Sequence, residues 1–388
     1  MIRKEILENQ ALTAHGLFFD DPHRDLIREE DEKGRPNGRY IDLPKGVEVM
    51  PNGDVKFAFH APDAKSVSVM GAGGSFPEIE HPMEKGADGW WRVTVTGLES
   101  AFHFVNFIVD GTRCLNPYMP YGYGYGRAIN TFELPDKYSE FYLLHDVPHG
   151  SVRMDYFWSE TVNDFRTCFV YTPPHYDRDR AKRYPVLYLQ HGGGESDACW
   201  IWQGKINHIM DNLLADGQCP EMIVVMNCGY VYPVEETEHT GSFITPVEDL
   251  IVRDSIPFID KKYRTLADRH HRAIAGFSMG GGQTLKTVAA YPEYFANAGV
   301  VSAPSIRTDR TDKLGLLTDA QKFNEYFDLF FVNAGEYEPC CPVLRETTRK
   351  MRAEGFKLVF FSSPGYHEWA PWRYGVMEFA KRLFPDCK

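Results

Sequence analysis

The sequence has no long apolar run. No stretch approaches the roughly 18 consecutive apolar residues that a membrane-spanning helix needs, and the opening residues 1–10 lack the apolar core of a secretory signal. We therefore expect a soluble protein without a membrane partner, cytoplasmic as the sequence stands. If the natural protein carries a leader that is removed, we expect it to be secreted or periplasmic instead.

Basic residues are also fewer than acidic residues. The 388 residues include 42 lysines and arginines against 54 aspartates and glutamates, which gives a formal net charge of −12. An acidic chain repels phosphate groups, so we expect no sequence-independent binding of nucleic acid or of an anionic membrane. Uncharged substrates or polymers fit this charge balance better.

The cysteines form neither a C-x-x-C pair nor a zinc-ribbon spacing. The eight are Cys114, Cys168, Cys199, Cys219, Cys228, Cys340, Cys341 and Cys387. Such scattered positions are typical of reduced thiols packed in a core. We predict no metal site and no cofactor.

Short alternating stretches begin at about residue 54. Apolar and polar residues alternate with period two over 55–59, 66–70, 91–95 and 102–109, with turn pairs such as Asn52-Gly53 and Asp110-Gly111 between them. This pattern predicts a small all-β, immunoglobulin-like sandwich over residues 46–140. Residues 20–38, dense in charge, show neither helical nor strand period, so we interpret residues 1–45 as an N-terminal arm.

The remaining residues, 141–388, have a different pattern. Continuous apolar runs, most of them followed by turn residues and helical segments, occur at 184–189, 222–226, 272–275, 298–301, 329–332 and 357–361. Runs of this kind suit parallel strands that are buried on both faces. They predict a doubly wound, mostly parallel sheet covered by helices, ending in an amphipathic helix over about 374–383.

The strongest local motif is Gly276-Phe277-Ser278-Met279-Gly280, between a strand and a helical segment. Strand, sharp turn and helix are the context in which a G-x-S-x-G serine is an exposed nucleophile, as in α/β hydrolases. A serine hydroxyl needs a base, which in this fold follows an acid later in the chain. His367, directly after the last apolar run, fits that order.

The acid has two candidates. The turn after the run at 329–332 contains Glu336 and Glu338, and either carboxylate could orient the imidazole. We favour Glu338 and keep Glu336 as the alternative.

A glycine loop, His191-Gly192-Gly193-Gly194, follows an earlier strand. Glycines let backbone N–H groups approach a substrate oxygen, so we expect the N–H groups of Met279 and of Gly193 or its neighbour to form the oxyanion hole. No G-K-[ST] follows this loop, which argues against nucleotide binding, and the His367 segment lacks the second histidine of a zinc protease.

With these motifs, residues 147–385 resemble carbohydrate esterase family 1, which includes feruloyl esterases and acetyl xylan esterases. The resemblance covers the glycine loop, the serine motif and the segment from His367 to Arg373, which is similar to the family's His-x-Trp-x-x-Trp-Arg ending. The family usually has aspartate where this chain has Glu338.

The N-terminal part resembles the family 48 carbohydrate-binding modules over about 90 residues. The motifs are Phe59-His60-Ala61-Pro62-Asp63-Ala64, Pro82-Met83, Gly89-Trp90-Trp91, Val109-Asp110-Gly111 and Asn116-Pro117-Tyr118. Adjacent residues of a strand point to opposite faces, so one of Trp90 and Trp91 should face the core and the other outward. Glycan contact through the outward ring and simple packing are both open.

The resemblance implies a serine hydrolase that removes esters from plant cell-wall xylan, most simply ferulate from arabinoxylan through an acyl-enzyme. Feruloylated or acetylated xylan and its oligosaccharides would be the partners. Alternatives are an acetyl xylan esterase, an enterochelin-type siderophore esterase and a catalytically silent glycan-binding scaffold. We expect Trp200, Trp202, Trp369 and His191 to contact the substrate, with core packing as the alternative for the tryptophans.

Overall fold

The computed structural model describes residues 24–42, 44–134, 138–231, 246–306, 312 and 314–387. Within it the chain divides into two compact units, residues 1–139 and 140–388. Of the helices in the described ranges, none combines the length and the apolar character needed to cross a membrane.

The first unit begins with an antiparallel hairpin, β1 (Arg24–Glu30) and β2 (Pro36–Asp42). Its turn is closed by the Asp31 carboxylate, which accepts hydrogen bonds from the backbone N–H groups of Lys33 and Arg35, and Gly34 has a φ of 69°. The prediction that this segment lacks strand structure was wrong, because the local turn, and not hydrophobic alternation, pairs its strands.

The rest of the first unit is a β-sandwich. One sheet has the order β11-β12-β9-β5-β6 with β10 beside β9, and the other has the order β3-β4-β8-β7. The strands are β3 (Val47–Val49), β4 (Val55–His60), β5 (Val67–Gly71), β6 (His81–Pro82), β7 (Glu84–Lys85), β8 (Trp90–Val95), β9 (Phe102–Val109), β10 (Thr112–Cys114), β11 (Tyr121–Gly124) and β12 (Arg127–Glu133). Phe57 of β4 packs against Phe107 and Phe132 of the facing sheet, with ring centroids 6.3 and 5.5 Å apart.

Trp90 and Trp91 point to opposite faces of β8, yet both are buried. Trp91 belongs to the sandwich core. Trp90 faces the other way but lies between His60 and Tyr118, each ring 5.0 Å from it, and is only 6% exposed. Neither ring offers a free face to a glycan.

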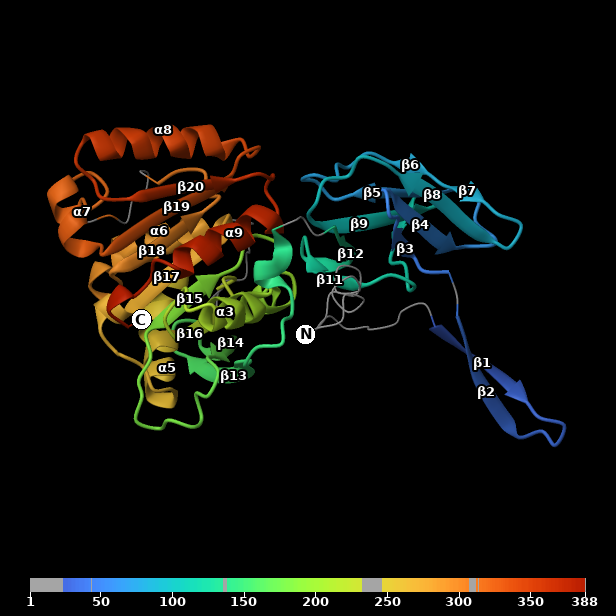
Figure 1. The fold of residues 1–388 in the computed structure, drawn as a ribbon, viewed down its shortest axis with the longest axis horizontal. Helices are drawn as coiled ribbons and strands as arrows, with labels where there is room; N and C mark the ends of the chain where they lie inside the picture. The colour runs from blue at the N-terminus through green and yellow to red at the C-terminus, as the bar shows by residue number, and fades with distance from the viewer. Residues whose placement is uncertain are drawn as a thin grey trace. The chain divides into compact units, whose positions relative to one another are not determined.

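The second unit contains an eight-stranded sheet in the order β13-β14-β16-β15-β17-β18-β19-β20 (Figure 1). The strands are β13 (Ser151–Ser159), β14 (Asp164–Thr172), β15 (Val186–Gln190), β16 (Ile223–Asn227), β17 (Arg272–Phe277), β18 (Asn297–Val301), β19 (Leu329–Gly335) and β20 (Val359–Ser363). Strands β15 to β20 are parallel, whereas β13 and β14 form an antiparallel extension at one end. The predicted fold class, a mostly parallel α/β sheet after an all-β sandwich, is confirmed.

Helices cover both faces of this sheet. Phe330 and Phe331 are neighbours on β19 and point in opposite directions, Phe330 to Phe323 of α7 and Phe331 to Phe379 of α9. The α-helices are α2 (Cys199–Trp202), α3 (Ile206–Ala215), α4 (Val247–Asp249), α5 (Ile256–Lys262), α6 (Met279–Ala290), α7 (Ala320–Tyr326), α8 (Cys340–Ala353) and α9 (Trp369–Ala380), and a π-helical turn, η2 (Leu250–Ser255), precedes α5. Helix α9 begins about five residues earlier than predicted, since Trp369 and Trp372 share its buried face with Phe379.

Asp211 of α3 connects the segment before β13 to strand β14 through hydrogen bonds. Its carboxylate, 2% exposed, accepts hydrogen bonds from Gly150 N–H (2.9 Å) and the Tyr171 hydroxyl (2.7 Å), and lies 2.9 Å from His149 Nδ1. A buried carboxylate is stable only when such partners replace its water.

We expect Asp211→Asn to lower the free energy of unfolding by about 2–3 kcal/mol, because it removes charge-assisted hydrogen bonds from a buried site. Asp216→Asn, at the exposed end of the same helix, should change it by less than about 0.5 kcal/mol. Urea unfolding of both variants measures the difference. Equal stability of the two variants would contradict the role given to Asp211.

Candidate active site

Ser278 lies at the sharp turn between β17 and α6. Its φ of 54° and ψ of −116° are unusual for a residue with a side chain. The turn is held by hydrogen bonds from Ser278 N–H to the Val301 carbonyl (2.9 Å) and from Gly282 N–H to the Ser278 carbonyl (3.1 Å). These bonds keep Ser278 at the carboxyl edge of the parallel strands.

The two flanking glycines are required by close backbone approach. A Cβ added at Gly280 would lie 2.6 Å from the His191 carbonyl oxygen, and one at Gly276 would lie 2.6 Å from the backbone of Gly280. No side chain fits at either position, so the G-x-S-x-G pattern permits the serine turn to pack against the glycine loop after β15.

Glu338, after β19, makes the hydrogen bond to His367, after β20. Glu338 Oε2 lies 2.8 Å from His367 Nδ1. Its Oε1 accepts hydrogen bonds from the Ser302 hydroxyl (2.6 Å) and from Gly335 N–H (2.8 Å). The Cys340 thiol lies 3.2 Å from Oε2, so both carboxylate oxygens have partners.

The environment keeps Glu338 ionised. Burial by itself would raise the pKa of this carboxyl, but the hydrogen bonds from His367 and Ser302 outweigh burial and hold its pKa below the ordinary value. Glu336 is exposed, and its carboxylate lies 3.5 Å from the Ser362 hydroxyl. Of the two candidate acids, the structure therefore brings Glu338 to the imidazole.

Ser278, Glu338 and His367 follow strands β17, β19 and β20 at the same edge of one sheet. With Nδ1 directed at the carboxylate, His367 has Nε2 left for a reacting hydroxyl, and its side chain is 47% exposed. Placed in this way, the three side chains can act as a nucleophile, a base and an acid in acyl transfer.

Of the two expected oxyanion donors, Met279 directly follows Ser278. Met279 is the first residue of α6, where the backbone N–H has no partner within the helix. Gly193 is exposed, whereas the N–H of Gly194 donates to the Tyr230 hydroxyl. The assignment of Met279 and Gly193 as donors stays a prediction.

His191 lies inside the domain, whereas we expected it from the sequence to contact substrate. It is fully buried, and its Nε2 accepts a hydrogen bond from Gly229 N–H (2.8 Å) while Nδ1 donates to the Gly192 carbonyl (2.8 Å). Burial lowers the pKa of His191 to about 4, so the ring is neutral at pH 7. Its role is to hold the glycine loop against the segment after β16.

Two of the three tryptophans expected to line an acyl pocket are buried instead. Trp200 and Trp369 are each 1% exposed and pack edge to face at 5.2 Å, and the Trp200 indole N–H donates to the Gln190 carbonyl (3.0 Å). The two large flat rings fill the space between α2, β17 and α9, and so form part of the packed interior next to the Ser278 turn. Trp202 is half-buried, and its contact with substrate stays a prediction.

Sequence reasoning missed Ser302 and the part played by Trp372. The Trp372 indole N–H donates to the Ser302 hydroxyl (3.0 Å), which donates to Glu338. The Trp372 ring also stacks on Phe277 at 4.0 Å and meets His367 edge-on at 5.1 Å. Trp372 belongs to the segment from His367 to Arg373 that resembles the family ending, so the sequence did contain a signal for it. No motif in the sequence pointed to Ser302, whose backbone φ is 51°.

Glu195, at the end of the glycine loop, is a buried acid. It is 6% exposed and accepts a hydrogen bond from the Gln203 amide (3.0 Å). Burial raises the pKa of Glu195 to about 8, although the indole N–H of Trp369 acts in the opposite direction. Glu195 is therefore mostly protonated at pH 7. In the described ranges, no three His, Cys, Asp or Glu side chains are grouped to hold a metal ion.

Both units match known families. Residues 159–379, more than half of the chain, match the family described as "Putative esterase", and residues 44–121 match "Carbohydrate-binding module 48 (Isoamylase N-terminal domain)". The chain is 33% identical over 395 residues to an endo-1,4-beta-xylanase/feruloyl esterase of Xylanibacter ruminicola, covering 96% of this chain and 52% of that protein. The chain thus spans about half the length of this curated relative.

Solved structures share the fold. A ferulic acid esterase is 28% identical with a TM-score of 0.52, covering 60% of this chain and 97% of that one. The enterobactin esterase FES from Shigella flexneri is 17% identical with a TM-score of 0.63, covering 87% of this chain and 96% of that one. The resemblances drawn from the sequence motifs are confirmed.

We expect Glu338→Gln to lower kcat for an aryl ester about 10³- to 10⁴-fold, because an amide no longer stabilises the charged imidazole. Glu336→Gln, the matched control in the same turn, should leave kcat within about twofold. Hydrolysis of p-nitrophenyl acetate measures both, and equal losses in the two variants would remove Glu338 from the triad.

Glu195 should make stability depend on pH. The unfolded chain releases this proton near pH 4.5, whereas the folded chain keeps it to about pH 8. Stability contributed by this group therefore falls as the pH rises from about 4.5 to 8. Relative to Glu195→Gln, the wild type should lose up to about 1.4 kcal/mol of unfolding free energy per pH unit in this window.

Urea unfolding of wild type and Glu195→Gln at pH 5, 6.5 and 8 measures this loss. A difference between the two proteins that stays constant across the three pH values would show that Glu195 titrates normally.

Proposed function

The chain belongs to the esterase family matched by residues 159–379, and from this membership we propose that it is a feruloyl esterase acting on feruloylated xylan. The observation that carries the catalytic part is the His367–Glu338 hydrogen bond of 2.8 Å beside the strained Ser278 turn. The acyl group is supported by the two relatives named for ferulate ester hydrolysis. The polysaccharide is supported by the xylanase activity named for the first relative and by the carbohydrate-binding module match.

The reaction proceeds through an acyl-enzyme. Ser278 Oγ attacks the ester carbonyl while His367 Nε2 takes the hydroxyl proton, and the carbonyl oxygen, now negative, is held by the N–H groups of Met279 and Gly193. The imidazolium, stabilised by Glu338, returns the proton to the departing sugar oxygen as the C–O bond breaks. Water then repeats the sequence and releases the carboxylic acid and Ser278.

A siderophore ester is a second candidate, because the similarity to the enterobactin esterase extends over 87% of the chain and so includes both units. The net charge of −12 disfavours an anionic catechol ligand. Acetylated xylan is a third candidate, and its acyl group is much smaller than feruloyl and lacks the aromatic ring.

We expect the wild type to release ferulate from methyl ferulate and from feruloylated arabinoxylan, and Ser278→Ala to be slower by at least about 10⁴-fold. Chromatography of released acids from these two substrates, acetylated xylan and enterobactin is the measurement. Acetate without ferulate would move the assignment to deacetylation, and cleavage of enterobactin alone would move it to the siderophore ester.

A further inference from the structure

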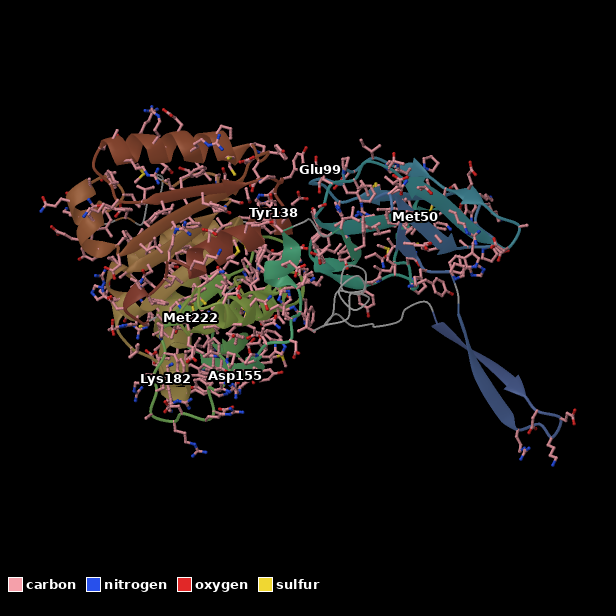
Figure 2. The ribbon with its side chains drawn as sticks, viewed as in Figure 1. Met50, Glu99, Tyr138, Asp155, Lys182 and Met222 are labelled. Atoms are coloured by element: carbon pink, nitrogen blue, oxygen red, sulfur yellow. The ribbon has the colours of Figure 1, made fainter. Side chains whose placement is uncertain are left out.

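The end strand β13 carries a row of exposed apolar side chains. Every second residue points away from the core, and the row continues onto β14 with Phe165. Its members and their exposed fractions are Val152 (37%), Met154 (50%), Tyr156 (57%), Trp158 (45%) and Phe165 (67%). The opposite face of β13 is covered, since Asp155 (labelled in Figure 2) accepts hydrogen bonds from Lys262 and Tyr263, and Phe157 stacks on Phe258.

The three aromatic members gather at the active-site edge of the sheet. One row of paired residues crosses five strands: Ile274, Tyr188, Val225, Val170 and Arg153. Ser278 lies four residues beyond this row toward the carboxyl ends of the parallel strands, and Trp158 and Phe165 lie five residues beyond it in the same direction. At about 4.8 Å per strand, β14 and β13 lie roughly 14–19 Å from β17.

The same edge of β14 is hydrogen-bonded to the glycine loop and to the residues that follow it. The Thr167 hydroxyl donates to Asp197, three residues after Gly194 (2.7 Å). Arg166 donates to the carbonyl of Tyr230 (2.6 Å), whose hydroxyl accepts from Gly194 N–H. The aromatic residues and the catalytic serine therefore belong to one continuous edge of one domain.

The chemistry of this patch fits an uncharged polysaccharide. Trp158 and Phe165 are fixed edge to face at 5.2 Å, so their exposed surfaces are ordered before any ligand arrives. Ring faces pack against the C–H faces of sugars, and the exposed Asp164 carboxylate beside them can accept sugar hydroxyls. Three half-exposed rings offer about 300 Å², well below the roughly 800 Å² per partner of a stable dimer.

We propose that Tyr156, Trp158 and Phe165 form a distal binding site for the neutral backbone of the polysaccharide, several sugars away from the ester that Ser278 cleaves. This inference rests on the proposed function for its substrate class. The site raises the affinity for polymer and does not act on the acyl group, so small esters do not use it.

The test compares a Trp158→Ala/Phe165→Ala double variant with the control Val152→Ala, which removes an exposed apolar side chain from the far end of the same row. The double variant should raise KM for feruloylated arabinoxylan about tenfold and leave kcat/KM for methyl ferulate within about twofold. In the Ser278→Ala background, affinity electrophoresis in gels containing arabinoxylan without ferulate should show that the double variant is retarded less by the polymer than the protein with Trp158 and Phe165 intact. The control should match the wild type in each measurement.

Unchanged KM on the polymer, or equal losses on polymer and methyl ferulate, would overturn the proposal. Light scattering that finds a wild-type dimer made monomeric by the double variant, with polymer binding unchanged, would assign the row to a second copy of the chain and also overturn it. Should wild type fail to cleave methyl ferulate while arabinoxylan binding still depends on Trp158 and Phe165, the proposed function fails and the distal site stands.

Discussion

The Glu338 carboxylate is the point at which the ends of three strands meet. It accepts hydrogen bonds from Ser302 after β18 and from Gly335 at the end of β19, and it bonds His367 after β20. Loops at strand ends are otherwise free to vary, so a buried charge that needs all its partners sets their spacing. The position of His367 relative to the ends of β18 and β19 therefore depends on the hydrogen bonds of this one carboxylate.

Aromatic rings support this polar cluster from below. Phe277, directly before the nucleophile, stacks on Trp372 and packs against Trp369 and Trp200, which in turn bonds the end of β15. Tight packing in an interior leaves few alternative arrangements, so the rings hold the serine turn, the histidine loop and the glycine loop at fixed positions. Trp200, Trp369 and Trp372 are buried, so what they contribute is the packing that positions these segments.

The sequence predicted those strands and site residues that follow from hydrophobic periodicity and from the order of motifs along the chain. Buried runs such as 222–226 and 298–301 are strands because parallel strands must be apolar on both faces, and Ser278 and His367 follow from the fold's chain order. It favoured Glu338 but left Glu336 open, since the direction in which the turn points each carboxylate depends on the folded backbone. It missed the antiparallel strands β13 and β14, since the exposed face of β13 breaks the rule that apolar side chains point inward. It expected Trp200 and Trp369 in an acyl pocket, with core packing as the alternative, because nearness in sequence to the catalytic loops does not determine depth.

The buried Trp90 and the exposed row on β13 both bear on which unit of the chain offers rings to a polysaccharide. A carbohydrate-binding module match suggests that glycan contact lies in the first unit, yet Trp90 is covered by His60 and Tyr118, and Trp91 belongs to the core. Exposed rings occur in the first unit at Tyr123 and Tyr125, and also on the second unit's sheet, at the edge that carries Ser278. A chain that meets its polymer through the catalytic domain keeps the ester and the backbone contacts on one rigid body, so binding of the backbone also orients the ester.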